Sequence, residues 1–382
     1  MKRVNRRRFL GLGGAALAAM NVPAIARHSN HSKEETSGLD QENSGPVPMI
    51  HVGDIFHHHG DPDDHWDLAS VYALAYSGYV DLKGIVIDWP PRKTFGDPDV
   101  MGVAQLNYIT GLVVPAVTGT PYTMKHRNDI QADADPIDHQ GINWVIETLR
   151  ESPSPVIINV VGASTDIALA IKKEPELFAS KCKAIYQNAG SAITRRDKPI
   201  EYNTGLDPFA YATLFDAPCP VYWLPCFHDR ATNEVGGYGS YYRFLQNDIL
   251  RHLPKKLLNF FLFMLGWARS HKWLEYLNGE PDQRLLDSKG DMYRAMWCTA
   301  GFLHAAGKKV TSEGDIVPLD SEGESVCSFV PVKVDCDDEG YTDWEKDPHS
   351  DKRFIFHVDD EQNYEKAMTT ALRDLLLQLP QS

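Results

Sequence analysis

The stretch that decides the fold is IHVGDIFHHHGDPDDHWDLASVYALA, residues 50–75. It begins as an apolar segment that predicts a β-strand and continues through a turn crowded with aspartates. Apolar residues then recur from Leu68 to Ala75 at positions i, i+3, i+4 and i+7, which predicts an amphipathic helix. Asp54 closes the strand, so this stretch gathers acids where the chain passes from strand to helix.

Four aspartates lie within seven residues of this turn, at positions 61, 63, 64 and 67. One interpretation is an acidic helix cap, because Asp61 suits the N-cap and the helix dipole favours negative charge in the first turn. Asp67 fits this interpretation less well, since it lies a turn further on and repels Asp63 and Asp64 unless a cation is present. A hard, oxygen-seeking ion such as Ca²⁺ would relieve that repulsion. Both interpretations, cap and metal site, stay open at this point.

Length, charge and cysteine spacing exclude several classes of protein. With 382 residues and 43% hydrophobic content, the chain is long enough to bury a full core in one large domain or two small ones. The formal charge of −14 argues against nucleic acid or an anionic membrane as the main partner. The six cysteines form no CxxC pair, so neither a zinc ribbon nor a redox motif is indicated.

The N-terminus predicts export. Residues 1–26 combine a basic start, an apolar middle rich in Gly and Ala, and a small-residue end, which indicates a signal peptide, and NRRRFLG resembles the twin-arginine class. Its removal takes away five cations and no acids, so the formal charge falls from −14 to −19. Residues 27–47 are polar and predict a flexible tether. We expect residues 48–382 to form the catalytic domain of an exported, periplasmic or otherwise extracytoplasmic protein that makes no contact with the membrane after cleavage. An uncleaved N-terminal anchor is the alternative.

Strands alternate with helices over the first half of the predicted domain, which predicts an α/β fold with a mostly parallel central sheet and helices on both faces. After the opening stretch, buried strands are expected at 79–88, 113–120, 155–161, 182–190 and 219–225. Helices are expected at 103–110, 141–151, 165–175 and 208–217. Ligands of such sheets bind beyond the carboxyl ends of the strands, so Asp88, Val161 and the acidic turn should meet at one rim.

The second half of the predicted domain differs from the first in its sequence pattern. Longer helical segments rich in aromatic residues run from about 237 to 285, and they predict a helical cap near the rim of the sheet. LLNFFLFMLGW, residues 257–267, is too short to span a bilayer. One helix is expected over 290–307, β segments over 328–336 and 352–358, and an amphipathic helix over 361–379.

Five motifs in this order resemble the inosine/uridine-preferring nucleoside hydrolase family, whose members cleave the N-glycosidic bond of ribonucleosides with a bound Ca²⁺. The family's DTDxGxDDAxAL turn and its LxGIT strand match here through Asp67 and Gly84, whose spacing agrees without a gap. Its GPLTN-like turn resembles VVGASTDIALA (160–170), its EFNxxxDPEAA segment resembles EYNTGLDPFAY (201–211), and its HDPLA helix start resembles GDMYRA (290–295).

The resemblance implies a Rossmann-like nucleoside hydrolase fold, a nucleoside or ribosyl substrate and a Ca²⁺ cofactor. It implies that the Ca²⁺ is held by Asp67, Asp291, the backbone carbonyl of Val161 and an acid from the front of the turn, Asp61 or Asp64. It also implies that Glu201 and Asn203 hydrogen-bond the ribose, and by analogy that the protein self-associates.

This sequence departs from the family pattern at several positions. Trp66 stands at the family's penultimate aspartate and Pro62 at its general base, so Asp61 is our candidate for the catalytic base and Asp64 the next. Asp88 is our stand-in for the missing Gly-Asn at the end of the second strand motif. Gly290 replaces the family's histidine, so His228 is our candidate to contact the leaving group, with Tyr242 as its alternative.

Two functions of different classes follow. The first is a Ca²⁺-dependent hydrolase of ribonucleosides or a related ribosyl compound, in which water attacks C1′. The second is a nucleoside- or sugar-binding protein that kept the fold and lost catalysis. A hydrolase of another glycoside is a third hypothesis. We expect small molecules rather than nucleic acid as the partners in each case.

Overall fold

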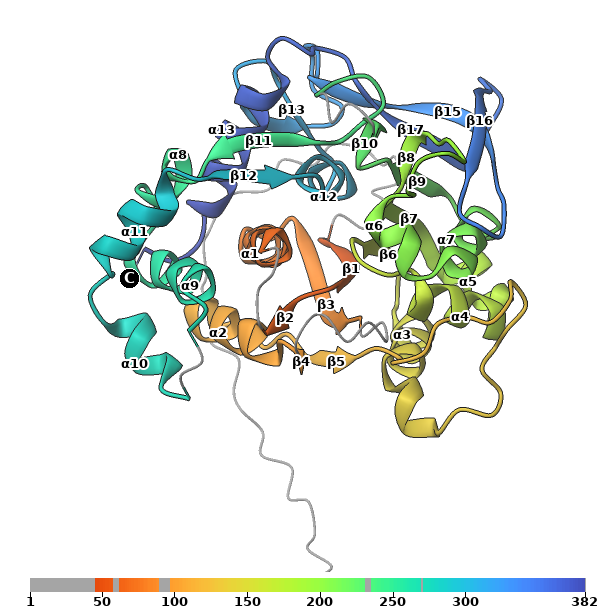
Figure 1. Cartoon of the computed structure of the whole chain (residues 1–382), viewed down its shortest axis with the longest axis horizontal. Helices are drawn as coiled ribbons and strands as arrows, with labels where there is room; N and C mark the ends of the chain where they lie inside the picture. The colour runs from red at the N-terminus through yellow and green to blue at the C-terminus, as the bar shows by residue number, and fades with distance from the viewer. Residues whose placement is uncertain (1–44, 58–61, 89–96, 231–234, 269–270, 382) are drawn as a thin grey trace, which may run out of the picture. The chain divides into compact units, whose positions relative to one another are not determined.

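The computed structural model describes residues 45–57, 62–88, 97–230, 235–268 and 271–381. The predicted signal peptide and most of the predicted tether lie outside the described residues, and so does Asp61. Within the described part, the chain follows the alternation of strands and helices that the sequence predicts, and the account below concerns this part (Figure 1).

A nine-stranded sheet runs through the described chain, in the order β16-β15-β17-β9-β7-β6-β1-β3-β5. The seven strands from β17 to β5 are parallel to their neighbours, whereas β15 and β16 add an antiparallel edge. In sheet order, the strands are β16 (Thr342–Lys346), β15 (Cys327–Cys336), β17 (Arg353–Val358), β9 (Val221–Leu224), β7 (Cys182–Asn188), β6 (Val156–Val160), β1 (Val47–Gly53), β3 (Val80–Ile87) and β5 (Ala116–Thr118).

Helices cover both faces of this sheet, because its central strands are apolar on both sides. Met49 of β1 belongs to one hydrophobic cluster and Ile50 and Val52 to another, as expected when successive side chains of a strand point to opposite faces. The first cluster includes residues of α1 (Asp63–Tyr76), α2 (Val100–Thr110), α9 (Lys255–Leu265), α12 (Thr299–Ala305) and α13 (Tyr364–Leu376). The second includes residues of α3 (Gln140–Glu151), α4 (Thr165–Lys173), α5 (Pro175–Lys181) and α7 (Pro208–Phe215).

Shorter elements connect these layers. They are the helices α6 (Tyr202–Leu206), α8 (Asn247–Leu250), α10 (Trp273–Asn278), α11 (Gln283–Gly290) and the 3-10 helix η1 (Pro136–His139). Four small two-stranded sheets join β2 (Phe56–His57) to β4 (Asp97–Pro98), β8 (Ser191–Ile193) to β10 (Phe227–Asp229), β11 (Tyr242–Leu245) to β12 (Tyr293–Met296), and β13 (Lys308–Val310) to β14 (Ile316–Pro318). Among the described helices, none combines the length and the apolar character that crossing a membrane would require.

The prediction of a single helix over residues 290–307 is wrong. Helix α11 ends at Gly290, residues 293–296 form β12, and α12 begins only at Thr299. The physical reason is long-range pairing, since β12 is antiparallel to β11, with Tyr242 opposite Met296. A strand partner about 50 residues away cannot be read from local periodicity.

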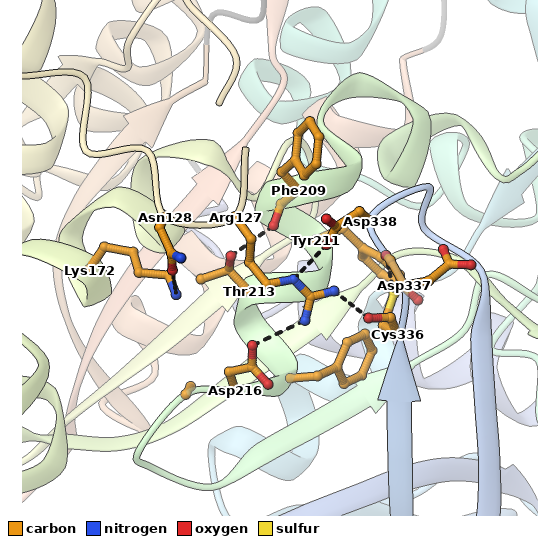
Figure 2. A network of polar contacts seen from close by, with 12 residues as sticks. Arg127, Asn128, Lys172, Phe209, Tyr211, Thr213, Asp216, Cys336, Asp337 and Asp338 are labelled. Carbon is orange, nitrogen blue, oxygen red and sulfur yellow. Dashed lines mark hydrogen bonds and ion pairs between the residues drawn. The ribbon is translucent and has the colours of Figure 1, made fainter. Parts of the chain in front are cut away.

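A polar network fixes one outer corner of the fold (Figure 2). Arg127, in the long loop after β5, forms ion pairs with Asp216 at the end of α7 and Asp338 beyond β15, at 3.2 and 2.9 Å. Its guanidinium also donates to the backbone carbonyl of Cys336. One arginine therefore joins three segments that are distant in the sequence.

The topology also determines where a ligand can bind. Strand β1 lies between β6 on one side and β3 on the other, so the chain order reverses at β1. In open α/β sheets, the crevice beyond the carboxyl ends of strands at such a switch point is where ligands bind. Asp54, Asp88 and Val161 directly follow β1, β3 and β6, as the sequence predicts.

Candidate active site

The carboxyl ends of β1, β3 and β6 come close together around Gly162. A Cβ at this position would collide with Asp88 Oδ2 and would lie 2.9 Å from Asp54 Oδ1, so only a glycine leaves room for both carboxyl groups. Asp88 Oδ2 accepts a hydrogen bond from the backbone N–H of Ala163. Asp88 Oδ1 is buried and has no hydrogen-bond partner within the described chain. The predicted meeting of Asp88 with the turn after β6 is therefore confirmed.

Helix α1 brings two more carboxyl groups to this edge. Asp64 and Asp67 are 7% and 1% exposed, and the Asp64 carboxyl lies beside Gly53, at the end of β1. The helix N-cap is Pro62, which offers no side-chain cap hydrogen bond. Burial of this degree does not suit acids that serve only as a solvated helix cap, so the cap interpretation accounts for little of this cluster.

Trp66, the departure from the family pattern in the first turn of this helix, packs against aromatic residues. It is fully buried, with ring centroids 4.1 Å from Phe261 of α9 and 5.4 Å from Phe244 of β11. An aspartate there would point into an apolar layer. The aromatic segment that predicts a cap thus packs directly on the helix that carries the acids.

The carboxyl groups disturb one another electrostatically. Burial raises the pKa of Asp64 well above its ordinary value, and the neighbouring carboxyl groups, Asp54 first, raise it further. A side-chain hydrogen bond with Asp54 also raises the pKa of Asp64, because it favours the protonated form. Burial raises the pKa of Asp67 to about 7, while a hydrogen bond with Cys298 opposes the shift. Burial likewise raises the pKa of Asp88, and the charge of Asp54 adds to it.

Cys298, rather than Asp291, is the partner of Asp67 from the C-terminal half of the chain. The thiol of Cys298 donates to Asn188 Oδ1 at 2.8 Å and lies against the Asp67 carboxyl, whose pKa it lowers. Asn188, at the end of β7, is held in place because its Nδ2 donates to Leu224 O and Ser240 Oγ at 2.9 and 3.0 Å.

The structure contradicts the prediction that Asp291 converges with Asp67 on one ion. Asp291 is exposed at the end of α11, where its Oδ1 accepts a hydrogen bond from Asn247 Nδ2 at 2.9 Å. The physical reason is that strand β12 separates Asp291 from the next helix. The helix that approaches the acids is α12, which begins after Cys298 and not at Gly290.

The predicted ribose ligands lie beside the cluster. Asn203 Nδ2 donates to the backbone carbonyl of Val161 at 2.8 Å, which leaves that carbonyl its second lone pair. Glu201 caps α6, because its carboxylate accepts from the backbone N–H groups of Gly190, Asn203 and Thr204 at 2.8, 2.9 and 3.1 Å. Thr204 Oγ1 donates a fourth, longer hydrogen bond to this carboxylate at 3.4 Å. A carboxylate offers about four acceptor sites, so a ribose hydroxyl would have to replace the Thr204 bond to reach Glu201.

The two candidates for the leaving-group contact differ in environment. Tyr242 is fully buried and its hydroxyl lies 2.8 Å from Thr299 Oγ1, so it cannot face a ligand and that prediction is wrong. His228 is half-buried on β10, where its Nδ1 accepts from the backbone N–H of Tyr238 at 3.2 Å. A role for His228 in substrate contact stays a prediction.

The atoms of the cluster that could ligate a metal ion have the right chemistry for a hard cation, but their spacing fits one less well. All are oxygens, and Asp67 Oδ1 is buried without a hydrogen-bond partner among the described residues. However, no three His, Cys, Asp or Glu side chains of the described ranges are arranged so as to hold a metal ion. Ion binding would require the carboxyl groups to close further, or Asp61 to complete the set.

Comparisons with known proteins identify the family and the fold. Residues 91–278 match the family model of the inosine-uridine preferring nucleoside hydrolases. The chain belongs to this nucleoside hydrolase family. A solved purine-preferring ribonucleoside hydrolase from Gardnerella vaginalis superimposes with a TM-score of 0.53 at 16% identity, over 86% of this chain and 99% of that one, which shows the shared fold.

Sequence similarity to individual members is local. Pyrimidine-specific ribonucleoside hydrolases RihA of Salmonella arizonae and Citrobacter koseri are each 30% identical over 81 residues, which is 21% of this chain and 26% of theirs. The chain thus aligns with about a quarter of the length of these nucleoside hydrolases. Their base preference therefore does not carry over to this member of the family.

Sequence reasoning did not include two residues of the site. Asp54 is the first acid after β1 and stands at the switch point, a signal that the dense acidic turn after it obscured. Cys298 had no such signal, because its position before α12 follows from the β11–β12 pairing alone.

Proposed function

We propose that this protein hydrolyses the N-glycosidic bond of a ribonucleoside or a related ribosyl compound. The observation that carries the proposal is the pair of buried carboxyl groups of Asp64 and Asp67, whose pKa values are raised, beside the half-buried Asp54 at the switch point of the sheet. Carboxyl groups with perturbed pKa values at the ligand-binding edge of a fold are candidates for acid–base chemistry. Family membership supports this assignment.

Among the described residues, we assign Asp64 as the base. A raised pKa brings a carboxylate closer to the working pH, where it takes a proton from water most effectively. The water attacks C1′ as the bond to the leaving base breaks, and charge accumulates on the sugar as in an oxocarbenium ion. The negative charge of the Asp67 carboxylate favours that positive charge, while Asp64 takes the proton of the water. Asp61 remains our other candidate for the base.

We propose Ca²⁺ as the cofactor, held by Asp64, Asp67 and the carbonyl of Val161, with Asp61 where it can reach. Such an ion would orient the ribose hydroxyls and lower the pKa of an adjacent water. Asn203 would position the Val161 carbonyl, since its amide already donates to it. Asp291 has no part in this set, because it is exposed and bonded to Asn247.

Release of free base tests the proposal. We expect the purified protein to liberate base from at least one of inosine, uridine and p-nitrophenyl riboside, and we expect a chelator to abolish the release. Liberation of the aglycone from a non-ribosyl glycoside alone would favour the hydrolase of another glycoside. Release that persists unchanged in chelator would contradict the cofactor assignment.

Two features support a second candidate, a nucleoside- or sugar-binding protein without turnover. Cys298 rather than an acid faces Asp67, and the described carboxyl groups are not spaced to enclose an ion. A nucleoside that raises the melting temperature but releases no base over hours would support this candidate against the first.

We also propose that the protein acts outside the cytoplasm, on the support of its twin-arginine-like N-terminus. Replacement of Arg7 and Arg8 by lysine should leave the full chain in the cytoplasmic fraction. Unchanged export of that variant would contradict the twin-arginine route.

A further inference from the structure

A basic pocket opens next to the predicted ribose ligands, in a chain whose overall charge is −14. It contains about 300 Å³ of space, part of it open to solvent, between β8, β10 and the segment that leads into α6. Three cationic side chains line it, from Arg195, Lys198 and Arg230. Such a concentration of positive charge is unexpected on a strongly acidic protein, so it calls for an explanation.

The acids of the pocket neutralise only part of this charge. Asp229 forms an ion pair with Arg195 at 2.5 Å. Glu201, the only other acid in the lining, directs its carboxylate to three backbone N–H groups rather than to a cation. Arg230 donates to the backbone carbonyl of Ile200, which fixes its position without cancelling its charge. The lining therefore keeps a formal excess of one positive charge, and Asp197, outside the lining, lies 3.8 Å from Lys198. The charge of Glu201 is already partly compensated by the backbone.

The pocket adjoins the proposed site through α6. Glu201 both lines the pocket and caps α6, and Asn203, two residues further on, reaches the Val161 carbonyl beside the acids. A ribose held by Glu201 and Asn203 would thus have one side toward the acidic cluster and another toward the cations. A group attached to that second side would enter the basic pocket.

We propose that this pocket binds the phosphate of a phosphorylated ribosyl substrate. The proposal rests on the proposed function, since it places the ribose between the two regions. A phosphate monoester carries about −1.5 to −2 charges near neutral pH, which suits several cations better than one carboxylate would. Arginine binds phosphate oxygens through two parallel N–H bonds, while lysine adds a mobile point charge.

Binding of ribose 5-phosphate and of ribose to the full chain, measured by calorimetry at fixed ionic strength, tests this inference. We expect ribose 5-phosphate to bind at least about tenfold more tightly than ribose. Arg195→Met and Lys198→Met should each lower the affinity for ribose 5-phosphate about tenfold and leave the affinity for ribose unchanged. Lys198 is 52% exposed and its side chain forms an ion pair with its neighbour Asp197 at 3.8 Å, so we expect its replacement to leave the fold intact.

Arg150→Met is the matched control. Arg150 is 53% exposed and pairs with one carboxylate, as does Arg195 at 48%, but it lies on α3 and does not line the pocket. We expect this variant to bind ribose 5-phosphate like the unchanged protein. An equal loss in Arg150→Met would reduce the effect to general surface charge and overturn the inference.

Two further outcomes would also overturn it: equal affinities for ribose and ribose 5-phosphate, or inorganic phosphate binding as tightly as ribose 5-phosphate. If the protein releases base from a nucleoside and yet shows either outcome, the proposed function stands and the phosphate pocket is wrong. If it binds ribose 5-phosphate through Lys198 but releases no base, the phosphate pocket stands and the proposed hydrolysis is wrong.

Discussion

Two groups of aspartates in this protein differ in how their charge is balanced. At the outer corner, Asp216 and Asp338 are 56% and 60% exposed and share the guanidinium of Arg127 (Figure 2). At the switch point, Asp64 and Asp67 are buried, and the side chains that bond to them are another carboxyl group, Asp54, and a thiol, Cys298. The first group is complete within the chain and has a structural role.

In the second group, burial of neighbouring carboxyl groups costs free energy that contacts within the described chain offset only in part. Burial and mutual repulsion hold its carboxyl groups at raised pKa values, so part of the group stays protonated near neutral pH. Strain of this kind is retained where a site serves a ligand. The contrast between the two groups is thus a contrast between fold and function, and the following variants test it.

The largest expected effect is on catalysis. Asp67→Ala should lower the kcat/KM for base release by about ten-thousand-fold, because it removes a carboxylate that faces the developing charge. Asp216→Ala, a change of the same type at the outer corner, should leave kcat/KM within about twofold. Similar losses in the two variants would show that the groups do not differ in function.

The pH dependence of stability is expected to change next. The pKa of Asp67 is about 7 in the folded protein against 3.8 ordinarily, so the folded state retains a proton that the unfolded state releases. In chelator, the free energy of unfolding should therefore fall as pH rises from about 4 to about 7, by up to about 4 kcal/mol from this group. Asp67→Asn should flatten that part of the curve, as urea unfolding at each pH would show. An unchanged curve in the variant would argue against a neutral Asp67.

A smaller effect on kcat/KM is expected at Cys298, which lies against Asp67 where the sequence predicted Asp291. Cys298→Val should lower kcat/KM about tenfold, since it removes a hydrogen bond that stabilises the Asp67 carboxylate. Cys298→Ser should restore most of the activity, because serine keeps a donor. Asp291→Asn should have no effect, and a hundredfold loss there would restore Asp291 as a ligand.

Arg127 gives the smallest expected change. Arg127→Met should destabilise the fold by about 1 kcal/mol or less, because its ion pairs are partly exposed and screened by salt. The loss in the free energy of unfolding should shrink at high salt, while kcat/KM stays constant. A large loss of activity in Arg127→Met would mean that the outer corner acts on the site.

The central sheet was predictable because its signals are local. Buried parallel strands such as β6 are short apolar runs, and β3 was expected within two residues of its observed bounds. Because the carboxyl ends of parallel strands meet at one edge of a sheet, the predicted strands also placed Asp88 and Val161 together with the turn that leads into α1. The family resemblance gave Asn203 and Val161 separate roles in one site, and the hydrogen bond between them required coordinates.

The second half was less predictable because its signals are not local. The strand β12 forms through a partner about 50 residues earlier, and this pairing decides that Cys298 rather than Asp291 faces Asp67. The basic pocket likewise gathers side chains from β10 and the segment before α6, which are separated by about 30 residues. The electrostatic coupling of Asp54 with Asp64 also required coordinates, since sequence spacing gives no distance between carboxyl groups.

The account depends most on the claim that the buried acids form an incomplete site that accepts a cation. Calorimetric titration of Ca²⁺ into the chelator-treated protein at pH 6, in two buffers of different ionisation enthalpy, tests it directly. We predict one Ca²⁺ per chain with release of a proton, and neither in Asp67→Ala. Absence of binding up to millimolar Ca²⁺, or equal binding in Asp67→Ala, would contradict the account.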